Sequence, residues 1–132
     1  MSDYAKMRRL PVIAMRGLVV LPDMVGHIDL KTKDVEGAFR SIMEMDSEVV
    51  LATMREGIDK ITDISSVFPV GVIATIKQRV SLPNGNVRLL LEGRTRVEFR
   101  DLRVVSNGSY LGDVVEKEIN VFFVIIKLKK LF

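Results

Sequence analysis

Two alternating runs joined by a turn signal in the middle of the chain constrain its fold most. Within residues 71–82, every second residue from Val72 to Leu82 lies on one face and is apolar except Gln78. After the turn, Val87, Leu89 and Leu91 share one face of a return strand. The turn, residues 83–86, contains an Asn-Gly pair that tolerates the positive φ angles of a tight hairpin. Because residues 71–82 are long for one strand, we expect a β-bulge or bend within them.

Shorter runs on both sides of this hairpin are typical of strands, and one segment has helical periodicity. Strands are expected at residues 10–21, where Arg16-Gly17 interrupts the run between 10–15 and 18–21, and at 27–30, 49–52, 95–99 and 110–115, with turns at Glu92-Gly93 and at 106–109. Residues 33–45 repeat apolar side chains at helical spacing, and residues 55–66 read as a loop with one helical turn. Six or seven short strands and one main helix, without βαβ alternation, favour an α+β, mainly β fold that is curled toward a barrel.

Charge and composition limit the classes of partner. The 132 residues include 20 Lys and Arg against 17 Asp and Glu, but the surplus is Lys127, Lys129 and Lys130, so residues 1–119 carry no net charge. A nucleic-acid-binding face needs surplus cations to neutralise phosphates, so nucleic acid is not an expected partner. The longest strongly apolar run, residues 121–126, is too short to span a bilayer, and we expect no membrane association. The lack of cysteine excludes disulfides and fits a reducing cytoplasm.

The two ends of the chain differ from its central part. Residues 1–9 are mixed polar and charged and are expected to form a flexible arm, whereas residues 10–119 read as one domain. Residues 120–132 combine high β-propensity with no proline and no acid, which is typical of aggregation-prone segments. Three explanations of this atypical apolar and basic tail stay open. It is an artefact such as an out-of-frame extension, or it forms a divergent helix, or it pairs with another copy of the chain.

The pattern of polar residues predicts no catalytic, metal-binding or cofactor-binding site. The one histidine, His27, has no hydroxyl nucleophile placed in a turn for it to activate, and we expect it on the solvent face of a strand. The spacing of carboxylates and His27 fits no metal site, and no run has the two glycines, Lys and Ser or Thr of a phosphate loop. The chain is therefore not expected to be an enzyme on its own.

Three stretches form an ordered set that covers most of the chain. The first is Leu10-Pro11-Val12, then Met-Arg-Gly-Leu-Val-Val-Leu-Pro at 15–22 and Met24. The second is Val-Gly-Val-Ile-Ala-Thr-Ile at 70–76, and the third is Leu-Pro-Asn-Gly-Asn-Val-Arg-Leu-Leu-Leu-Glu-Gly-Arg-Thr-Arg at 82–96. Together they resemble the N-terminal domain of Lon ATP-dependent proteases. The segment 26–31, Gly-His-Ile-Asp-Leu-Lys, departs from that pattern, which has a more apolar strand there and often a Val-Gly-Arg step before the helix.

The resemblance implies a PUA-like fold over residues 10–119, a curled six-stranded pseudo-barrel with one main helix. It implies a non-catalytic domain of an ATP-dependent serine endopeptidase, whose ATP, Mg²⁺ and Ser-Lys chemistry belong to modules outside this chain. The implied partners are unfolded or damaged protein substrates and other Lon subunits of a homo-oligomer, in the cytoplasm. Two alternatives stay open: a stand-alone PUA-like module that binds RNA or protein, and a purely structural oligomerisation domain.

Methionines near the ends of expected elements are the candidate substrate contacts, because flexible thioether side chains suit surfaces that bind many unfolded chains. With neighbouring lysines as a charged rim, the candidate contacts are Met15, Met24, Lys31, Lys33, Met45 and Met54. The alternative is that the methionines are core residues and the lysines are merely solvated. The Arg16-Gly17 step is expected to be structural, with Arg16 lying along the barrel or paired with Glu92.

Overall fold

Six strands and one short 3-10 turn make up the part of the chain that the computed structural model describes, residues 7–17, 21–31, 47–105 and 109–117. The elements are β1 (Arg8–Met15), β2 (Val25–Leu30), β3 (Glu48–Thr53), η2 (Ile64–Ser66), β4 (Val70–Ser81), β5 (Val87–Val104) and β6 (Tyr110–Glu116). β1 begins inside the segment that the sequence predicted to be an arm. The helix expected at 33–45 and the tail at 120–132 lie outside the described residues. None of the described helices is long and apolar enough to cross a membrane.

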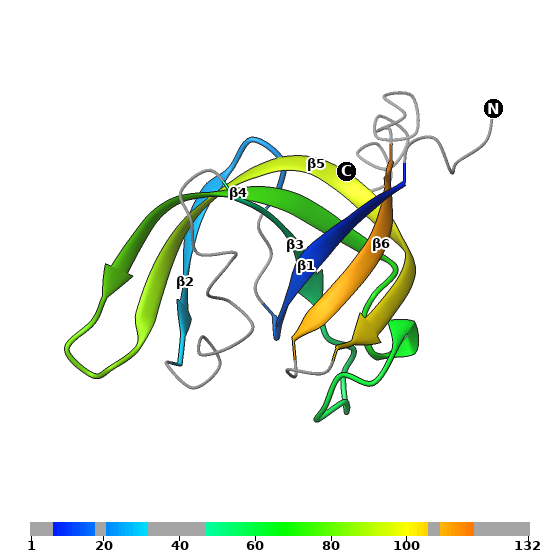
Figure 1. Cartoon of the computed structure of the whole chain (residues 1–132), viewed down its shortest axis with the longest axis horizontal. Coiled ribbons are helices and arrows are strands. Elements are labelled where there is room, and N and C mark those ends of the chain that lie inside the picture. The colour runs from blue at the N-terminus through cyan, green and yellow to red at the C-terminus, as the bar shows by residue number, and fades with distance from the viewer. Residues whose placement is uncertain (1–6, 18–20, 32–46, 106–108, 118–132) are drawn as a thin grey trace, which may run out of the picture.

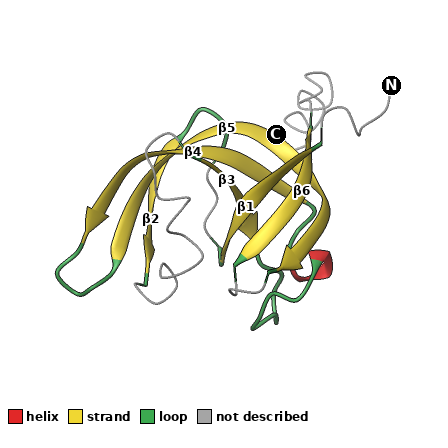
Figure 2. Ribbon diagram, viewed as in Figure 1, coloured by secondary structure: helices red, strands yellow, loops and turns green. Residues whose placement is uncertain are grey.

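The strands curl into a barrel that β5 closes. The sheet order is β2-β5-β4-β3-β1-β6, and β5 pairs additionally with β6. Along β5, residues 87–92 pair with β2, residues 87–98 pair with β4, and residues 97–104 pair with β6. A ring of five strands, β5-β4-β3-β1-β6, therefore closes on itself, and β2 extends it beside the first half of β5 (Figure 1). The arched β4 and β5 in Figure 2 illustrate the mainly β, curled six-stranded fold, which confirms the predicted fold class.

β5 continues through Glu92 and Gly93, where the sequence predicted a turn between two strands. That prediction was wrong because the irregularity is a bulge. Ile73 and Ala74 of β4 pair with residues 95 and 93 of β5, which leaves Arg94 as an extra residue that bends the strand without ending it. A second register shift, in which Ile76 and Gln78 of β4 pair with Leu91 and Leu90 of β5, leaves Lys77 as the extra residue and confirms the bulge expected in the long run of β4.

Both faces of the sheet are buried, and successive residues of a strand divide between two apolar clusters. In β1, Val12 packs in the barrel interior with Phe99, whereas Ile13 packs on the opposite face with Leu89 and Leu91. The barrel interior draws on all five strands of the ring, while the other cluster is the one to which β2 contributes, through Ile28. Burial on both faces explains why the apolar residues of β3 and early β4 are continuous rather than alternating.

The loop between β3 and β4 closes one end of the barrel. Its Ile61 and Val67 are buried in the barrel interior. Asp63 caps η2, because its carboxylate accepts a hydrogen bond from the backbone N–H of Ser65 at 2.8 Å while the Ser66 side chain bonds back to the Asp63 N–H. The structure thus confirms the single helical turn expected within residues 55–66.

Candidate functional site

The turn before β2 and the start of β2 gather exposed apolar side chains. Among the described residues, seven large apolar side chains are exposed, and three of them fall within residues 21–25: Leu21, Met24 and Val25, exposed to 42%, 45% and 61%. Exposed apolar residues are ordinary when scattered, but a local group of them is typical of a contact surface.

A bulge fixes the position of this group. Asp23 adopts a positive φ of 66°, which a short polar side chain tolerates better than most. Its N–H donates to the carbonyl oxygen of Gly93 at 2.9 Å, and the N–H of Gly93 donates to the carbonyl oxygen of Met24 at 2.8 Å. These two bonds tie the turn to the bend in β5, so the backbone that carries Met24 and Val25 is held in place while their side chains stay in solvent.

A groove of about 420 Å³ lies between β2 and the end of β1. Ala14, Met15 and Arg16 line one wall, and residues 27–30 of β2 line the other. Met15 and Leu30 are half-buried and pack against the cluster that contains Ile28, which gives the groove an apolar floor. Asp29 and Arg16 are exposed at its rim. A groove with an apolar floor and a charged rim suits a segment of polypeptide better than a small charged ligand.

The structure brings three of the predicted substrate contacts together around β2. Met24 and Lys31 are exposed at the two ends of the strand, and Met15 faces it across the groove. Met54 lies elsewhere: its side chain is half-buried against the barrel interior, on the opposite face of the sheet from Met15. Lys33 and Met45 lie outside the described residues.

Sequence reasoning did not select Leu21 and Val25, although a signal for Val25 was present. Val25, His27 and Asp29 are spaced two residues apart, so the alternation of side chains along β2 places all three on the exposed face, opposite Ile28. His27 is thus on the solvent face, as predicted. We call Met15, Leu21, Met24, Val25 and Lys31 the β2 surface.

The opposite opening of the barrel is polar. Arg8 and Glu48, at the starts of β1 and β3, form a bidentate ion pair with N–O distances of 2.7 and 3.1 Å. Hydrogen bonding to Arg8 lowers the pKa of the Glu48 carboxyl, and the same bonds raise the pKa of Arg8. Beside them the Arg94 Nε donates to the Thr75 hydroxyl at 3.2 Å, and these groups border a cavity of about 530 Å³. At this mouth Arg8 and Glu48 are paired with each other, and Arg94 lies 3.5 Å from Glu92.

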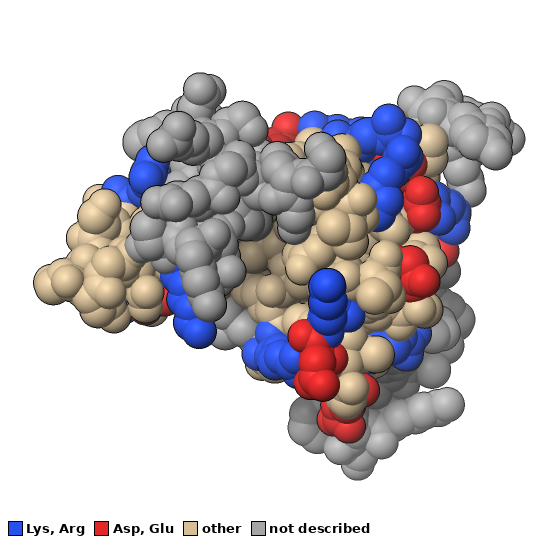
Figure 3. Space-filling view, turned by 60° about the horizontal axis from the view of Figure 1, so that its bottom comes forward, with Lys and Arg blue, Asp and Glu red and all other residues tan. Residues whose placement is uncertain are grey.

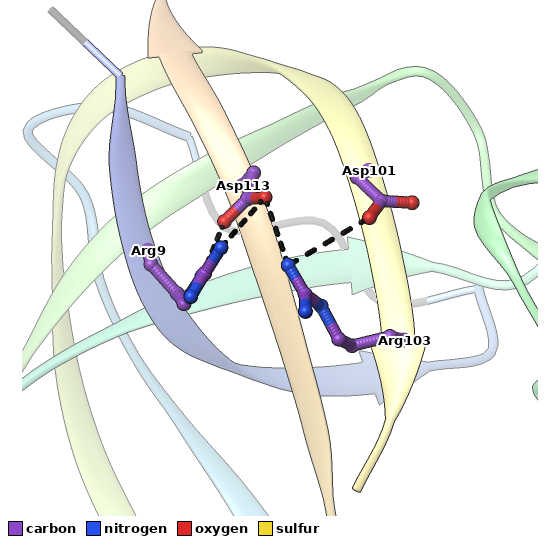
Figure 4. Close-up of polar contacts among 4 residues, drawn as sticks. All are labelled: Arg9, Asp101, Arg103 and Asp113. Carbon is purple, nitrogen blue, oxygen red and sulfur yellow. Dashed lines mark hydrogen bonds and ion pairs between the residues drawn. The ribbon is translucent and has the colours of Figure 1, made fainter.

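A second ion-pair network joins β1, β5 and β6 on the outside of the barrel (Figure 4). Arg9 donates through Nε to Asp113 Oδ1 at 2.8 Å, and Arg103 donates to Asp113 Oδ2 at 3.3 Å and lies 3.9 Å from Asp101. The hydrogen bonds from Arg9, and then the charges of Arg9 and Arg103, hold the pKa of the buried Asp113 carboxyl below its ordinary value. This network links the strands that close the barrel, so we assign it a role in stabilising the fold.

Cations on the described surface are interspersed with anions. Figure 3 shows Lys and Arg beside Asp and Glu on one face rather than in a separate patch. On β2, Asp29 accepts two hydrogen bonds from Arg88 of β5 at 2.7 and 3.0 Å, and these bonds lower the pKa of Asp29. Within the described ranges no three His, Asp or Glu side chains gather to hold a metal ion.

Of the two alternatives expected for Arg16, pairing with Glu92 was wrong. The Arg16 guanidinium donates to the carbonyl oxygen of Ile58 at 2.6 Å, so it fastens the end of β1 to the loop that covers the barrel. Glu92 lies instead near Lys77 and Arg94 at 3.8 and 3.5 Å. Glu92 thus has one partner on the adjacent strand β4 and one on its own strand β5, and sequence spacing could not reveal the partner on β4.

Comparison with known proteins gives one consistent family. The family model described as the ATP-dependent protease La (LON) substrate-binding domain matches residues 9–127. The Lon protease of Brevibacillus choshinensis is 34% identical over 101 residues, which are 76% of this chain and 13% of that protein. The Lon protease of Heliobacterium modesticaldum is 35% identical over 103 residues, 75% of this chain and 13% of that protein. The chain thus spans only a small part of the length of these relatives.

Solved structures share the fold. The N-terminal domain of a Mycobacterium avium complex Lon protease matches with a TM-score of 0.61 at 22% identity, covering 85% of this chain and 56% of that one. A Lon N-terminal domain protein from Xanthomonas campestris matches with a TM-score of 0.61 at 20% identity, covering 84% and 60%. With the family match over residues 9–127, these findings show that the chain belongs to the Lon substrate-binding domain family.

Proposed function

We propose that this chain is the non-catalytic N-terminal domain of an ATP-dependent Lon serine protease, and that it recognises unfolded or damaged protein substrates through the β2 surface. The observation that carries the proposal is the group of exposed apolar side chains Leu21, Met24 and Val25 beside a groove with an apolar floor. Family membership supports protein as the substrate class, and the groove with its exposed neighbours supports this location for it.

The chemistry of the β2 surface fits an unfolded chain. Unfolded proteins present apolar side chains without fixed shape, and Met15 and Met24 are flexible enough to pack against many of them. Lys31 adds one exposed charge at the end of β2. A phosphate backbone would instead need several unpaired cations, whereas Arg8, Arg9 and Arg88 are engaged by carboxylates.

One domain should bind weakly. A small apolar patch gains little beyond the entropy lost when two molecules associate, so we expect a Kd in the range of about 10 μM to 1 mM. Several domains on one oligomer would convert later contacts into intramolecular ones at roughly millimolar effective concentration. Assembly with other Lon subunits, a cytoplasmic location, and ATP and Mg²⁺ bound in a separate ATPase module belong to the same proposal.

The test is an NMR titration of the ¹⁵N-labelled chain with reduced, carboxymethylated α-lactalbumin, which stays unfolded. We expect amide shifts that cluster at residues 21–31 and at Met15. The Val25→Ser variant should weaken binding, whereas Val104→Ser, which changes another exposed valine at the far end of β5, should not. No shifts at millimolar concentration would refute substrate recognition and leave assembly as the remaining role. A sub-micromolar Kd would refute the weak, multivalent account.

A further inference from the structure

Among the described residues, β2 pairs with another strand on one side only. Each of the other five described strands has a neighbour on both sides, and β5 has three partners, whereas β2 pairs with β5 alone. A strand at the edge of a sheet offers a row of N–H and C=O groups that can template another strand. Closure of the barrel through β5 and β6 removes every other such edge among the described strands.

The register of β2 shows which backbone groups face outward. The Met24 carbonyl oxygen accepts a bond from Gly93 of β5, and antiparallel pairing alternates from there. The N–H and C=O groups of residues 26, 28 and 30 therefore point toward β5, whereas those of Val25, His27 and Asp29 point away from it. The outward set has the two-residue spacing that a further strand requires.

The surroundings of this edge favour an extended chain. The groove between β2 and the end of β1 lies along residues 27–30, and its floor includes Met15 and Leu30. A strand laid along β2 would place every second side chain over this floor and the others in solvent. Alternate apolar residues are common in the unfolded segments of β-rich proteins, so the groove suits such segments without demanding a particular sequence.

Devices that usually block an edge are missing from β2. Natural edge strands are commonly protected by proline, lysine or a bulge on the free side. Val25–Leu30 contains neither proline nor lysine, and the bulge at Asp23 and Met24 is turned toward β5. The one charged residue in the strand, Asp29, is held by Arg88 of β5 and therefore presents a neutralised pair to an incoming chain.

We propose that β2 is a docking edge, to which an extended segment of an unfolded protein substrate adds as a further strand through the backbone groups of Val25, His27 and Asp29. The proposal rests on substrate recognition by the β2 surface and names how the substrate is held. Main-chain pairing supplies affinity that is independent of sequence, and the groove adds a preference for alternating apolar side chains.

Hydrogen exchange of the whole chain tests this, with and without reduced, carboxymethylated α-lactalbumin. In the free chain the amides of Val25, His27 and Asp29 exchange quickly, whereas those of residues 26, 28 and 30 are protected. When nine-tenths of the chain is bound, the three outward amides slow by about tenfold, because only the free fraction exchanges. Outward amides that are already slow in the free chain, or that stay fast in the complex, overturn the proposal.

A pair of variants provides a second readout. His27→Pro removes an outward N–H without removing a bond to β5, and His27→Ala changes the same side chain but keeps the N–H. We expect His27→Pro to weaken binding by about tenfold relative to His27→Ala, the equivalent of one or two main-chain hydrogen bonds. Continued protection of residues 26, 28 and 30 shows that the proline variant keeps β2 folded.

The outcomes separate the two proposals. Binding that shifts residues 21–31 but leaves the outward amides fast, with equal affinity for both His27 variants, supports substrate recognition and overturns the docking edge. No binding at all overturns both. In the absence of substrate, the protection of the outward amides could also grow with the concentration of the chain. That result identifies a second copy as the occupant and overturns the proposal.

Discussion

Gly71 occupies a position in β4 where even a methyl group has no room. A Cβ atom added there would lie 2.7 Å from the backbone carbonyl oxygen of Leu51 in β3, 3.0 Å from Phe99 and 3.2 Å from Val50. The nearest of these atoms belongs to the backbone of the adjacent strand, which cannot retreat without disturbing the β3–β4 pairing. We predict that Gly71→Ala destabilises the barrel.

The magnitude follows from two opposing effects. Overpacking a close-packed core costs about 1–3 kcal/mol, and the upper end applies because a carbonyl oxygen is the obstacle. Alanine also lowers the conformational entropy of the unfolded chain, which stabilises the folded state by about 0.4–1 kcal/mol. The net loss for Gly71→Ala is therefore about 2 kcal/mol, which for a domain of this size lowers Tm by roughly 8 °C.

Gly112 provides a matched control in β6. A Cβ there would lie 2.8 Å from Val12 Cγ2 and 2.9 Å from Phe99 Cε1, and both are side-chain atoms that can shift. We expect Gly112→Ala to cost about 1 kcal/mol. On a Phe99→Leu background, the free-energy cost of Gly112→Ala should fall by about half. The cost of Gly71→Ala should stay within about 0.5 kcal/mol of its value in the parent chain.

Urea unfolding of the parent, the three single variants and the two double variants, followed by far-UV circular dichroism, gives these free energies. Gly71→Ala with a cost below about 0.5 kcal/mol would contradict the carbonyl contact as the limiting obstacle. Equal relief of both glycine variants by Phe99→Leu would show that the ring alone sets the cost at both positions.

Other parts of the structure make predictions of the same kind. Asp113→Asn should lower the free energy of unfolding by about 1–2 kcal/mol at pH 7, since it removes the charge that binds Arg9 and Arg103. Because the folded pKa of Asp113 is lowered, its contribution is present above the ordinary value of about 4 and is lost as the pH falls below it. Acid titration of unfolding should therefore show a shallower loss in Asp113→Asn than in the parent; an equal loss would contradict the assignment. Gly85→Ala at the hairpin tip, where φ is 85°, should cost about 1–2 kcal/mol by urea unfolding.

Local patterns in the sequence predicted the strands and the hairpin, but not how the sheet closes. The Asn-Gly turn and the alternation of Val87, Leu89 and Leu91 are short-range signals, and the structure confirms them. The Glu92-Gly93 step resembled a turn because glycine is common in both turns and bulges, and only its bonds to β2 and β4 distinguish the two. Pairing of β5 with β6 depends on the three-dimensional course of the chain, which no local pattern encodes.

Some candidate contacts are exposed and one is half-buried, for a physical reason. Met24 lies in a turn and Lys31 follows an edge strand, so their exposure could be expected from position alone. Met54 was selected as a residue beyond the end of a strand, yet it continues the alternation of Val50 and Ala52 and packs with them against the barrel interior. The period of two therefore extends past the last residue of β3 and was the better guide to burial.

An edge strand with one neighbour is also the part of a sheet that is easiest to open. Local opening can be far less costly than global unfolding where a segment has few partners, and β2 pairs with β5 through only six residue pairs. Its sequence, Val-Gly-His-Ile-Asp-Leu, buries one side chain fully, Ile28. A substrate that pairs only with folded β2 would stabilise it by about 1.4 kcal/mol at ten times its Kd. Substrate binding and the ordering of β2 are then one equilibrium.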